Sequence, residues 1–209
     1  MKAAGRRRTI GGMRVLIAAV AAFLLVPAAA IACACCADAG YWSSATNRLR
    51  TYELGQLDRI RFSPSANTFV GTAGLDGVTG ISAASTRYGL IRVKAGRRWT
   101  LRLRAPAGGG GSLSFDLPGS ALLFATDLRD GRRSIGGGPL LYKEWRLGGT
   151  VSGTGDFLSA TSGATYRLIL HGRGNACLDA RNFTRWTLQV RGAGARFTLF
   201  GSLRRPSGN

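Results

Sequence analysis

The stretch RWTLRLR, residues 98–104, decides the fold class, because its side chains alternate between apolar and polar. Trp99, Leu101 and Leu103 fall on one side of an extended chain, and the arginines fall on the other. A period of two is typical of a β-strand with one buried face. We therefore predict a half-buried strand at this position.

A second alternating stretch, residues 90–94 (LIRVK), precedes it, and Ala95-Gly96-Arg97 lies between the two as a turn. The two stretches predict a β-hairpin. Its inward side chains are expected to be Ile91, Val93, Trp99, Leu101 and Leu103.

The same pattern recurs along the chain. A second hairpin is predicted near the C-terminus from Trp186, Leu188, Val190, Phe197 and Leu199. Further strands are expected at 57–62, 113–117, 121–126, 140–147 and 166–171. No window after residue 45 shows a convincing helical period, and the glycine-rich segments suit hairpin turns. The sequence predicts an all-β fold, an antiparallel β-sandwich or closed barrel of about 8–10 strands after an N-terminal signal peptide.

The N-terminus has the three parts of a secretory signal peptide. Basic residues up to Arg14 precede an apolar run, residues 15–26, and Pro27 and a small-residue segment ending at Ala32 follow. A membrane anchor over residues 15–32 is the alternative, at the lower limit of length for a span. We expect cleavage after Ala32 and an exported protein, either periplasmic or extracellular.

Cleavage there makes Cys33 the first mature residue, and residues 30–33 (AIAC) partly match a bacterial lipid-attachment box. Cys33 is therefore a lipidation candidate, and membrane attachment is expected only if it is acylated. The predicted organisation is a signal peptide (1–32), a cysteine-rich tail (33–50), a single β domain (51–205) and a disordered end (206–209).

The chain is strongly basic, with 29 Lys and Arg against 10 Asp and Glu. Five of the basic residues and no acid precede Cys33, so the mature chain carries 24 basic and 10 acidic residues, a net charge of +14. Such a charge attracts anionic partners. Lipid head groups, lipopolysaccharide and acidic glycans are the expected class, because an exported protein seldom meets nucleic acid.

Four cysteines, an even number in an exported chain, favour disulfides. The candidates are Cys33, Cys35, Cys36 and Cys177. A bridge between the N-terminal cluster and Cys177 would fasten the tail to the sheet. The alternative is a copper or zinc site on the C-x-C-C cluster with Cys177 and His171, although zinc usually takes spaced cysteine pairs. No metal or other cofactor is assigned.

Catalytic templates find no match. His171 is the only histidine, no G-x-S-x-G elbow is present, and the glycine pairs lack the remainder of a nucleotide-binding motif. The sequence predicts a protein that is not an enzyme, with a structural or binding role.

Two binding surfaces are suggested. The polar side of the first hairpin would bring Arg92, Lys94, Arg102 and Arg104 onto one face, as an anion-binding site. Trp42 and Trp145 are candidates for a sugar-stacking platform, the basis of a carbohydrate-binding alternative. The sequence therefore predicts a structural or binding role toward anionic envelope components, with metal handling and carbohydrate binding as alternatives.

Overall fold

The computed structural model describes residues 42–70, 87–129, 140–175, 178–193 and 196–205. All of them belong to one compact unit of the chain, Cys33–Asn209. The predicted signal peptide, the four cysteines and the predicted disordered end lie outside the described residues. Within the described residues, the model contains no helix of the length and apolar character that crossing a membrane requires.

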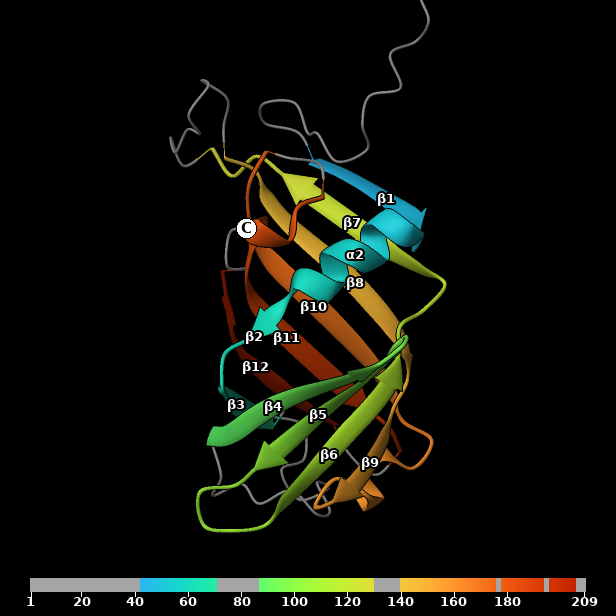
Figure 1. The fold of residues 1–209 in the computed structure, drawn as a ribbon, viewed down its shortest axis with the longest axis vertical. Helices are drawn as coiled ribbons and strands as arrows, with labels where there is room; N and C mark the ends of the chain where they lie inside the picture. Colours follow the sequence, from blue (N-terminus) through green and yellow to red (C-terminus); the bar gives the residue numbers. More distant parts are fainter. Residues whose placement is uncertain (1–41, 71–86, 130–139, 176–177, 194–195, 206–209) are drawn as a thin grey trace, which may run out of the picture. The chain divides into compact units, whose positions relative to one another are not determined.

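Twelve strands, one α-helix and two short 3₁₀ helices make up the described fold (Figure 1). In chain order they are β1 (Trp42–Arg48), α2 (Thr51–Arg59), β2 (Arg61–Phe62), β3 (Ser65–Val70), β4 (Arg87–Ala95), β5 (Arg98–Arg104), β6 (Gly110–Asp116), β7 (Ser120–Thr126), β8 (Tyr142–Thr150), β9 (Ser152–Gly155), η2 (Ser159–Thr161), β10 (Thr165–Arg173), η3 (Ala180–Asn182), β11 (Phe183–Arg191) and β12 (Arg196–Arg204). The predicted antiparallel, all-β class is confirmed.

The strands form a single sheet in the order β1-β7-β8-β10-β11-β12-β3-β4-β5-β6-β9, with β2 paired to β12. The two ends of this order, β1 and β9, do not pair with each other among the described residues, so the sheet is open. The closed barrel is therefore wrong, and so is a sandwich of two separate sheets. Strand β1 also lies inside residues 33–50, so the sheet begins earlier than the predicted domain.

The sheet curls over its own apolar face. Strand β8 runs on through Val151 into β9, and β9 pairs with β6 on the far side of the sheet order. Side chains from distant strands consequently meet inside: the Phe115 and Tyr166 rings lie 4.3 Å apart, from β6 and β10. Phe62 contacts Trp99 and Trp186 edge-on, from β5 and β11. One curled sheet thus provides the core that a sandwich would build from two.

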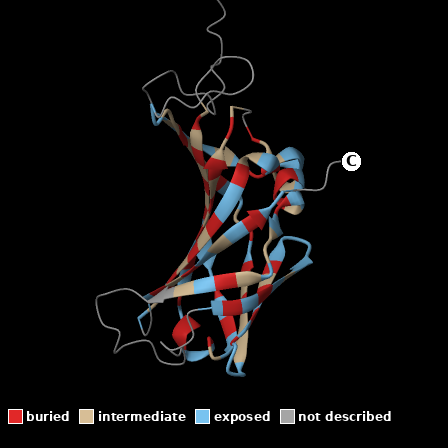
Figure 2. Cartoon of the chain, turned by 90° about the vertical axis from the view of Figure 1, so that its left-hand side faces the viewer, coloured by how far each residue is buried: buried red, intermediate tan, exposed pale blue. Residues whose placement is uncertain are grey.

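Burial alternates along the strands, as a period of two requires (Figure 2). The inward residues predicted for β5 and for the C-terminal hairpin are all buried. They are Trp99, Leu101, Leu103, Trp186, Leu188, Val190, Phe197 and Leu199. These predictions are confirmed, and they locate the core between β5 on one side and β11 and β12 on the other.

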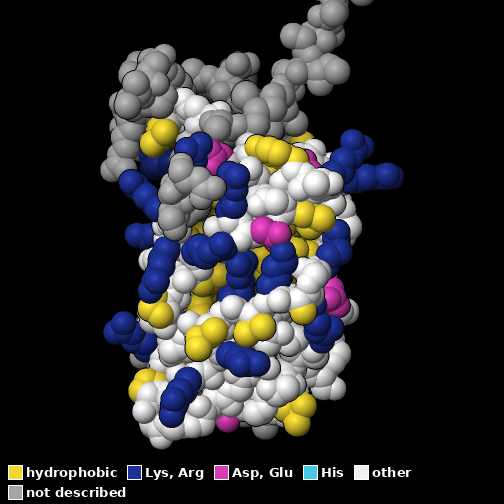
Figure 3. Space-filling view, in the orientation of Figure 1, with side chains coloured by type: hydrophobic (Ala, Val, Ile, Leu, Met, Phe, Trp, Pro, Cys, Tyr) yellow, Lys and Arg dark blue, Asp and Glu magenta, His cyan; other side chains and the backbone are white. Residues whose placement is uncertain are grey.

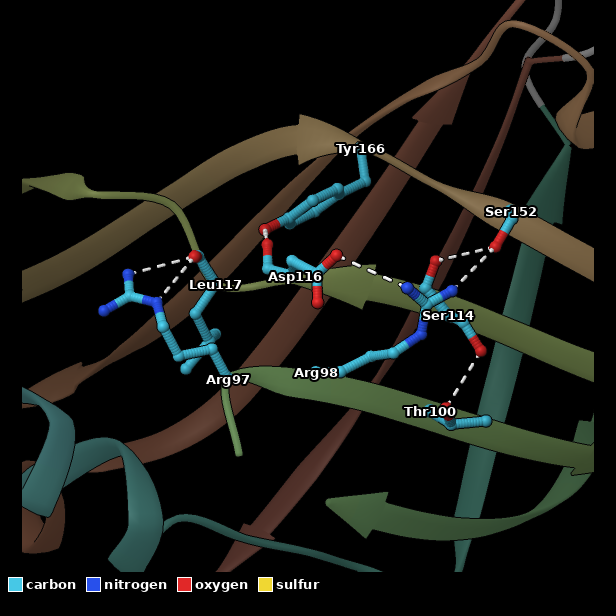
Figure 4. Close-up of polar contacts among 8 residues, drawn as sticks. All are labelled: Arg97, Arg98, Thr100, Ser114, Asp116, Leu117, Ser152 and Tyr166. Atoms are coloured by element: carbon cyan, nitrogen blue, oxygen red, sulfur yellow. Dashed lines mark hydrogen bonds and ion pairs between the residues drawn. The ribbon is translucent and has the colours of Figure 1, made fainter. Parts of the chain in front are cut away.

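Polar contacts tie β6 to its neighbours at one end of the sheet (Figure 4). The Tyr166 hydroxyl on β10 donates to the Asp116 carbonyl at 2.8 Å. Arg98 contacts both the Asp116 carboxylate and the Ser152 hydroxyl, each at 3.4 Å. Arg97 donates to the Leu117 carbonyl. Arg97 and Arg98 therefore stabilise the fold here by bonding to neighbouring strands and loops.

The helix α2 is not predicted from the sequence, which suggested a strand at 57–62. Its start is capped, since the Arg50 amide donates to the Glu53 carboxylate at 3.0 Å. Leu57 is buried, and the Gln56 side chain accepts a hydrogen bond from the Ala180 amide at 2.9 Å. The helix therefore packs between η3 and strand β4. Only Arg61 and Phe62 of the expected strand pair with β12.

A glycine run connects β5 to β6. Gly108, Gly109 and Gly110 all have positive φ, between 82° and 112°. A Cβ at Gly110 would collide with the Leu103 carbonyl oxygen. Glycine is therefore required here for a hairpin turn, in agreement with the predicted role of the glycine-rich segments.

Candidate functional site

The predicted anion-binding face on the first hairpin does not form. The register pairs Arg92 with Leu101 and Lys94 with Trp99. Directly paired residues share a face, so Arg92 and Lys94 lie on the inward side and Arg102 lies on the outward side. The prediction that these basic residues share one surface is wrong.

The error comes from the phase of β4. The two apolar residues Leu90 and Ile91 allow either alternation, and the inward set is Tyr88 and Leu90. Ile91 and Val93 instead point outward, with 66% and 37% of their surface exposed. They were expected in the core, and that expectation is wrong.

Arg92 and Lys94 have structural partners. The Arg92 guanidinium lies 4.5 Å from the centre of the Trp99 ring and 3.5 Å from the Leu57 carbonyl oxygen. Burial and, secondarily, the nearby Arg61 lower the pKa of Arg92. The Lys94 ammonium is 2.5 Å from the Asp58 carboxylate. Both cations therefore hold α2 against β4.

Arg102 and Arg104 stay exposed on the outer face of β5. Figure 3 shows Lys and Arg side chains spread over the face that carries α2 and β4, with few acidic side chains among them. Basic charge is thus widespread. A particular binding site therefore has to be identified by a concave surface and by basic side chains that have no acidic partner.

The proposed sugar platform of Trp42 and Trp145 is also wrong. Trp145 points into the core with 1% of its surface exposed, and its ring stacks on Phe183 with centres 6.1 Å apart. Trp42 is 68% exposed, on the outer face of β1. The two indoles therefore do not share a surface.

The outer face carries a basic groove that the sequence did not predict, with a volume of about 780 Å³. Its basic and aromatic lining consists of Tyr142, His171, Arg173, Arg181, Arg185 and Arg205. None of the described residues that line it is acidic. We call this feature the basic groove.

A β-bulge shapes the basic groove. His171 pairs with Arg185, whereas the next residue, Gly172, pairs with Phe183, so Thr184 is an extra residue in β11. Such a bulge bends its strand and changes the direction of nearby side chains. A Cβ on Gly172 would collide with the Asn182 carbonyl oxygen. The glycine therefore lets η3, with Arg181, approach the end of β10.

The arginines of the groove differ in pairing. Arg181 contacts Asp179 at 2.6 Å, and hydrogen bonding from Arg181 lowers the pKa of Asp179. Neither Arg185 nor Arg205 has a hydrogen-bond or carboxylate partner within the described ranges. Two guanidinium groups therefore have their donors available to a ligand.

The Glu144 carboxylate, on the strand next to His171, already has partners. Glu144 pairs with His171 across the β8–β10 ladder. One of its oxygens accepts from the Tyr142 hydroxyl and the other from Arg146 Nε, both at 2.6 Å. Arg146 also contacts Glu144 through its Nη2. Glu144 therefore neutralises Arg146 and leaves Arg185 uncompensated.

His171, near the end of β10, also lines the basic groove. Its Nε2 is 3.4 Å from the Thr187 hydroxyl. Burial lowers the pKa of His171, Glu144 raises it, and Arg185 lowers it, with a net decrease. The imidazole is therefore neutral near pH 7, where it acts as a hydrogen-bonding group. Within the described residues, no cluster of three His, Cys, Asp or Glu side chains suits a metal ion.

Comparisons with known proteins do not identify a relative: no family model matches the chain, and no curated protein or solved structure matches it significantly. The case for the basic groove therefore depends on its own geometry. Its arginines come from β10, η3, β11 and the segment after β12. No sequence motif connects them.

Proposed function

We propose that this chain is an exported protein that binds anionic ligands in the basic groove. One observation carries the proposal: Arg185 and Arg205 line a groove that contains no acidic lining residue, and neither has a partner among the described residues. Export is inferred from the N-terminal sequence pattern. Anionic components of the cell envelope are the ligand class.

The chemistry of the lining supports an oxyanion ligand. A guanidinium presents its N–H donors in a planar fork that matches phosphate, sulfate and carboxylate oxygens. The Tyr142 hydroxyl is committed to Glu144, but His171 remains as a neutral hydrogen-bonding group beside Arg185. The groove thus combines charge with directional donors, whereas a plain charged surface offers charge alone.

The test is isothermal titration of the purified protein with inorganic polyphosphate at low salt. The double variant Arg185→Gln, Arg205→Gln is expected to bind about a hundredfold more weakly, because each of the two charged hydrogen bonds contributes about 1.5 kcal/mol, roughly a factor of ten. Both side chains point outward, so the melting temperature is expected to stay close to that of the wild type.

The matched control is Arg167→Gln, Arg191→Gln. These arginines are exposed on the same two strands, β10 and β11, at the other end of the outer face. The control removes the same charge outside the basic groove, and we expect it to change the affinity by less than about threefold. Equal losses in the two double variants would contradict the proposal, because net charge alone would then explain binding.

A further inference from the structure

A second hollow adjoins the basic groove on the outer face, with a volume of about 590 Å³. His171 and Arg185 line both. Its other lining side chains include Asn67, Thr187, Thr198, Phe200 and Ser202. We call it the Phe200 hollow. The shared residues make the two features one continuous site with a basic half and an aromatic half.

The sheet register fixes the layout of the Phe200 hollow. Phe200 on β12 pairs with Thr187 on β11 and with Asn67 on β3. Ser202, two residues further along β12, pairs with Arg185. Arg185 is therefore a diagonal neighbour of Phe200, a relation that places Cβ atoms about 7–8 Å apart.

Phe200 is an exposed aromatic ring among polar neighbours. The ring is 40% exposed, and hydroxyl and amide groups of Thr187, Thr198, Ser202 and Asn67 surround it. A sugar ring has an apolar C–H face, which stacks on an aromatic ring, and a rim of hydroxyls, which bind surrounding polar groups. Phe200 and its polar neighbours provide both. An acyl chain would instead require a continuous aliphatic lining.

We propose that the ligand is a sugar phosphate, with the sugar ring on Phe200 and the phosphate on Arg185. The inference rests on the proposed anion binding and extends it by naming the ligand class. The diagonal spacing of Phe200 and Arg185 suits a sugar ring and a phosphate group that belong to one small molecule. Arg205 and His171 continue the donor set around the phosphate.

The experiment titrates the purified protein with glucose 6-phosphate, inorganic phosphate and glucose in separate calorimetric measurements. Glucose 6-phosphate is expected to bind about tenfold more tightly than inorganic phosphate, and glucose alone to bind more weakly than either. Phe200→Ala should remove this tenfold advantage while leaving the affinity for inorganic phosphate unchanged. The matched control, Trp42→Ala, removes an exposed aromatic side chain elsewhere on the outer face and should change neither affinity.

The outcomes separate the two proposals. A loss of about tenfold in phosphate affinity in Arg185→Gln, together with selective loss of the sugar advantage in Phe200→Ala, supports both. Equal affinities of the wild type for glucose 6-phosphate and inorganic phosphate would overturn the sugar inference and leave anion binding intact. Unchanged phosphate binding in Arg185→Gln would contradict anion binding itself.

A lipid source of the phosphate is tested separately with vesicles that contain phosphatidic acid. We expect glucose 6-phosphate to bind at the same affinity in the presence and absence of the vesicles. Binding of the vesicles that depends on Phe200, with no binding of glucose 6-phosphate, would overturn the sugar inference in favour of a lipid surface.

Discussion

The first hairpin and the basic groove carry similar numbers of cations and use them differently. In the hairpin, Arg92 lies over the Trp99 ring and Lys94 contacts Asp58. In the groove, Arg185 and Arg205 line a concave surface without an acidic lining residue. In both regions, basic residues gather on one part of the surface. The two regions differ in whether other parts of the chain supply a partner to each cation.

The helix α2 produces this difference. It supplies the Asp58 carboxylate and the Leu57 carbonyl to the inward side of β4. At the groove, by contrast, the nearby acids are already committed: Glu144 to Tyr142 and Arg146, and Asp179 to Arg181. A basic cluster therefore indicates a ligand site only where the neighbouring acids have other partners.

The largest expected difference between the two regions is in stability. Arg92→Ala should lower the free energy of unfolding by about 1–2 kcal/mol, because it removes the ring contact with Trp99 and the packing of the side-chain stem. Arg185→Ala should change it by less than about 0.5 kcal/mol, as expected for an exposed position. Urea denaturation of both variants measures the difference. Equal, small effects would show that Arg92 is not structural.

A smaller effect concerns pH. The pKa of His171 is lowered from 6.5 in the folded chain, so unfolding takes up protons as the solution becomes acidic. The stability that the neutral imidazole contributes is present above pH 6.5 and is lost as the pH falls through the folded pKa. His171→Gln should therefore reduce the decline in melting temperature between about pH 7 and pH 5.

Glu144 and Arg185 face His171 from the neighbouring strands, and Tyr142 lies within 6.5 Å, ring centre to ring centre. The appropriate control is Lys94→Met in the hairpin, which removes a cation with no histidine nearby. The same pH dependence in wild type and His171→Gln would assign the acid sensitivity to other groups.

The sequence predicts the strands well, because period-two alternation is a local property of the chain. Trp99, Leu101 and Leu103 are buried as expected. The phase of β4 is not determined locally, since Leu90 and Ile91 are both apolar. The helix α2 is missed because two turns with a central Gly55 give little periodicity.

The candidate site could not be predicted in the same way. Arg173, Arg181, Arg185 and Arg205 are separated by up to 32 positions in the sequence, and they meet through the β10–β11 ladder and the bulge near His171. Phe200 alternates as an ordinary outward residue of β12. Its partners Thr187 and Asn67 are identified only by the register. Tertiary pairing, which the sequence pattern does not contain, creates the site.

The most direct test of the contrast between the two regions is a phosphate titration followed through the arginine side-chain Nε–Hε resonances of the isotope-labelled protein. The resonances of Arg185 and Arg205 should shift along saturable curves with one common dissociation constant, whereas those of Arg92 and Arg102 should not follow that curve. Shifts of equal size and equal midpoint in all four arginines would contradict the account, because phosphate binding would then depend on net charge and not on a particular site.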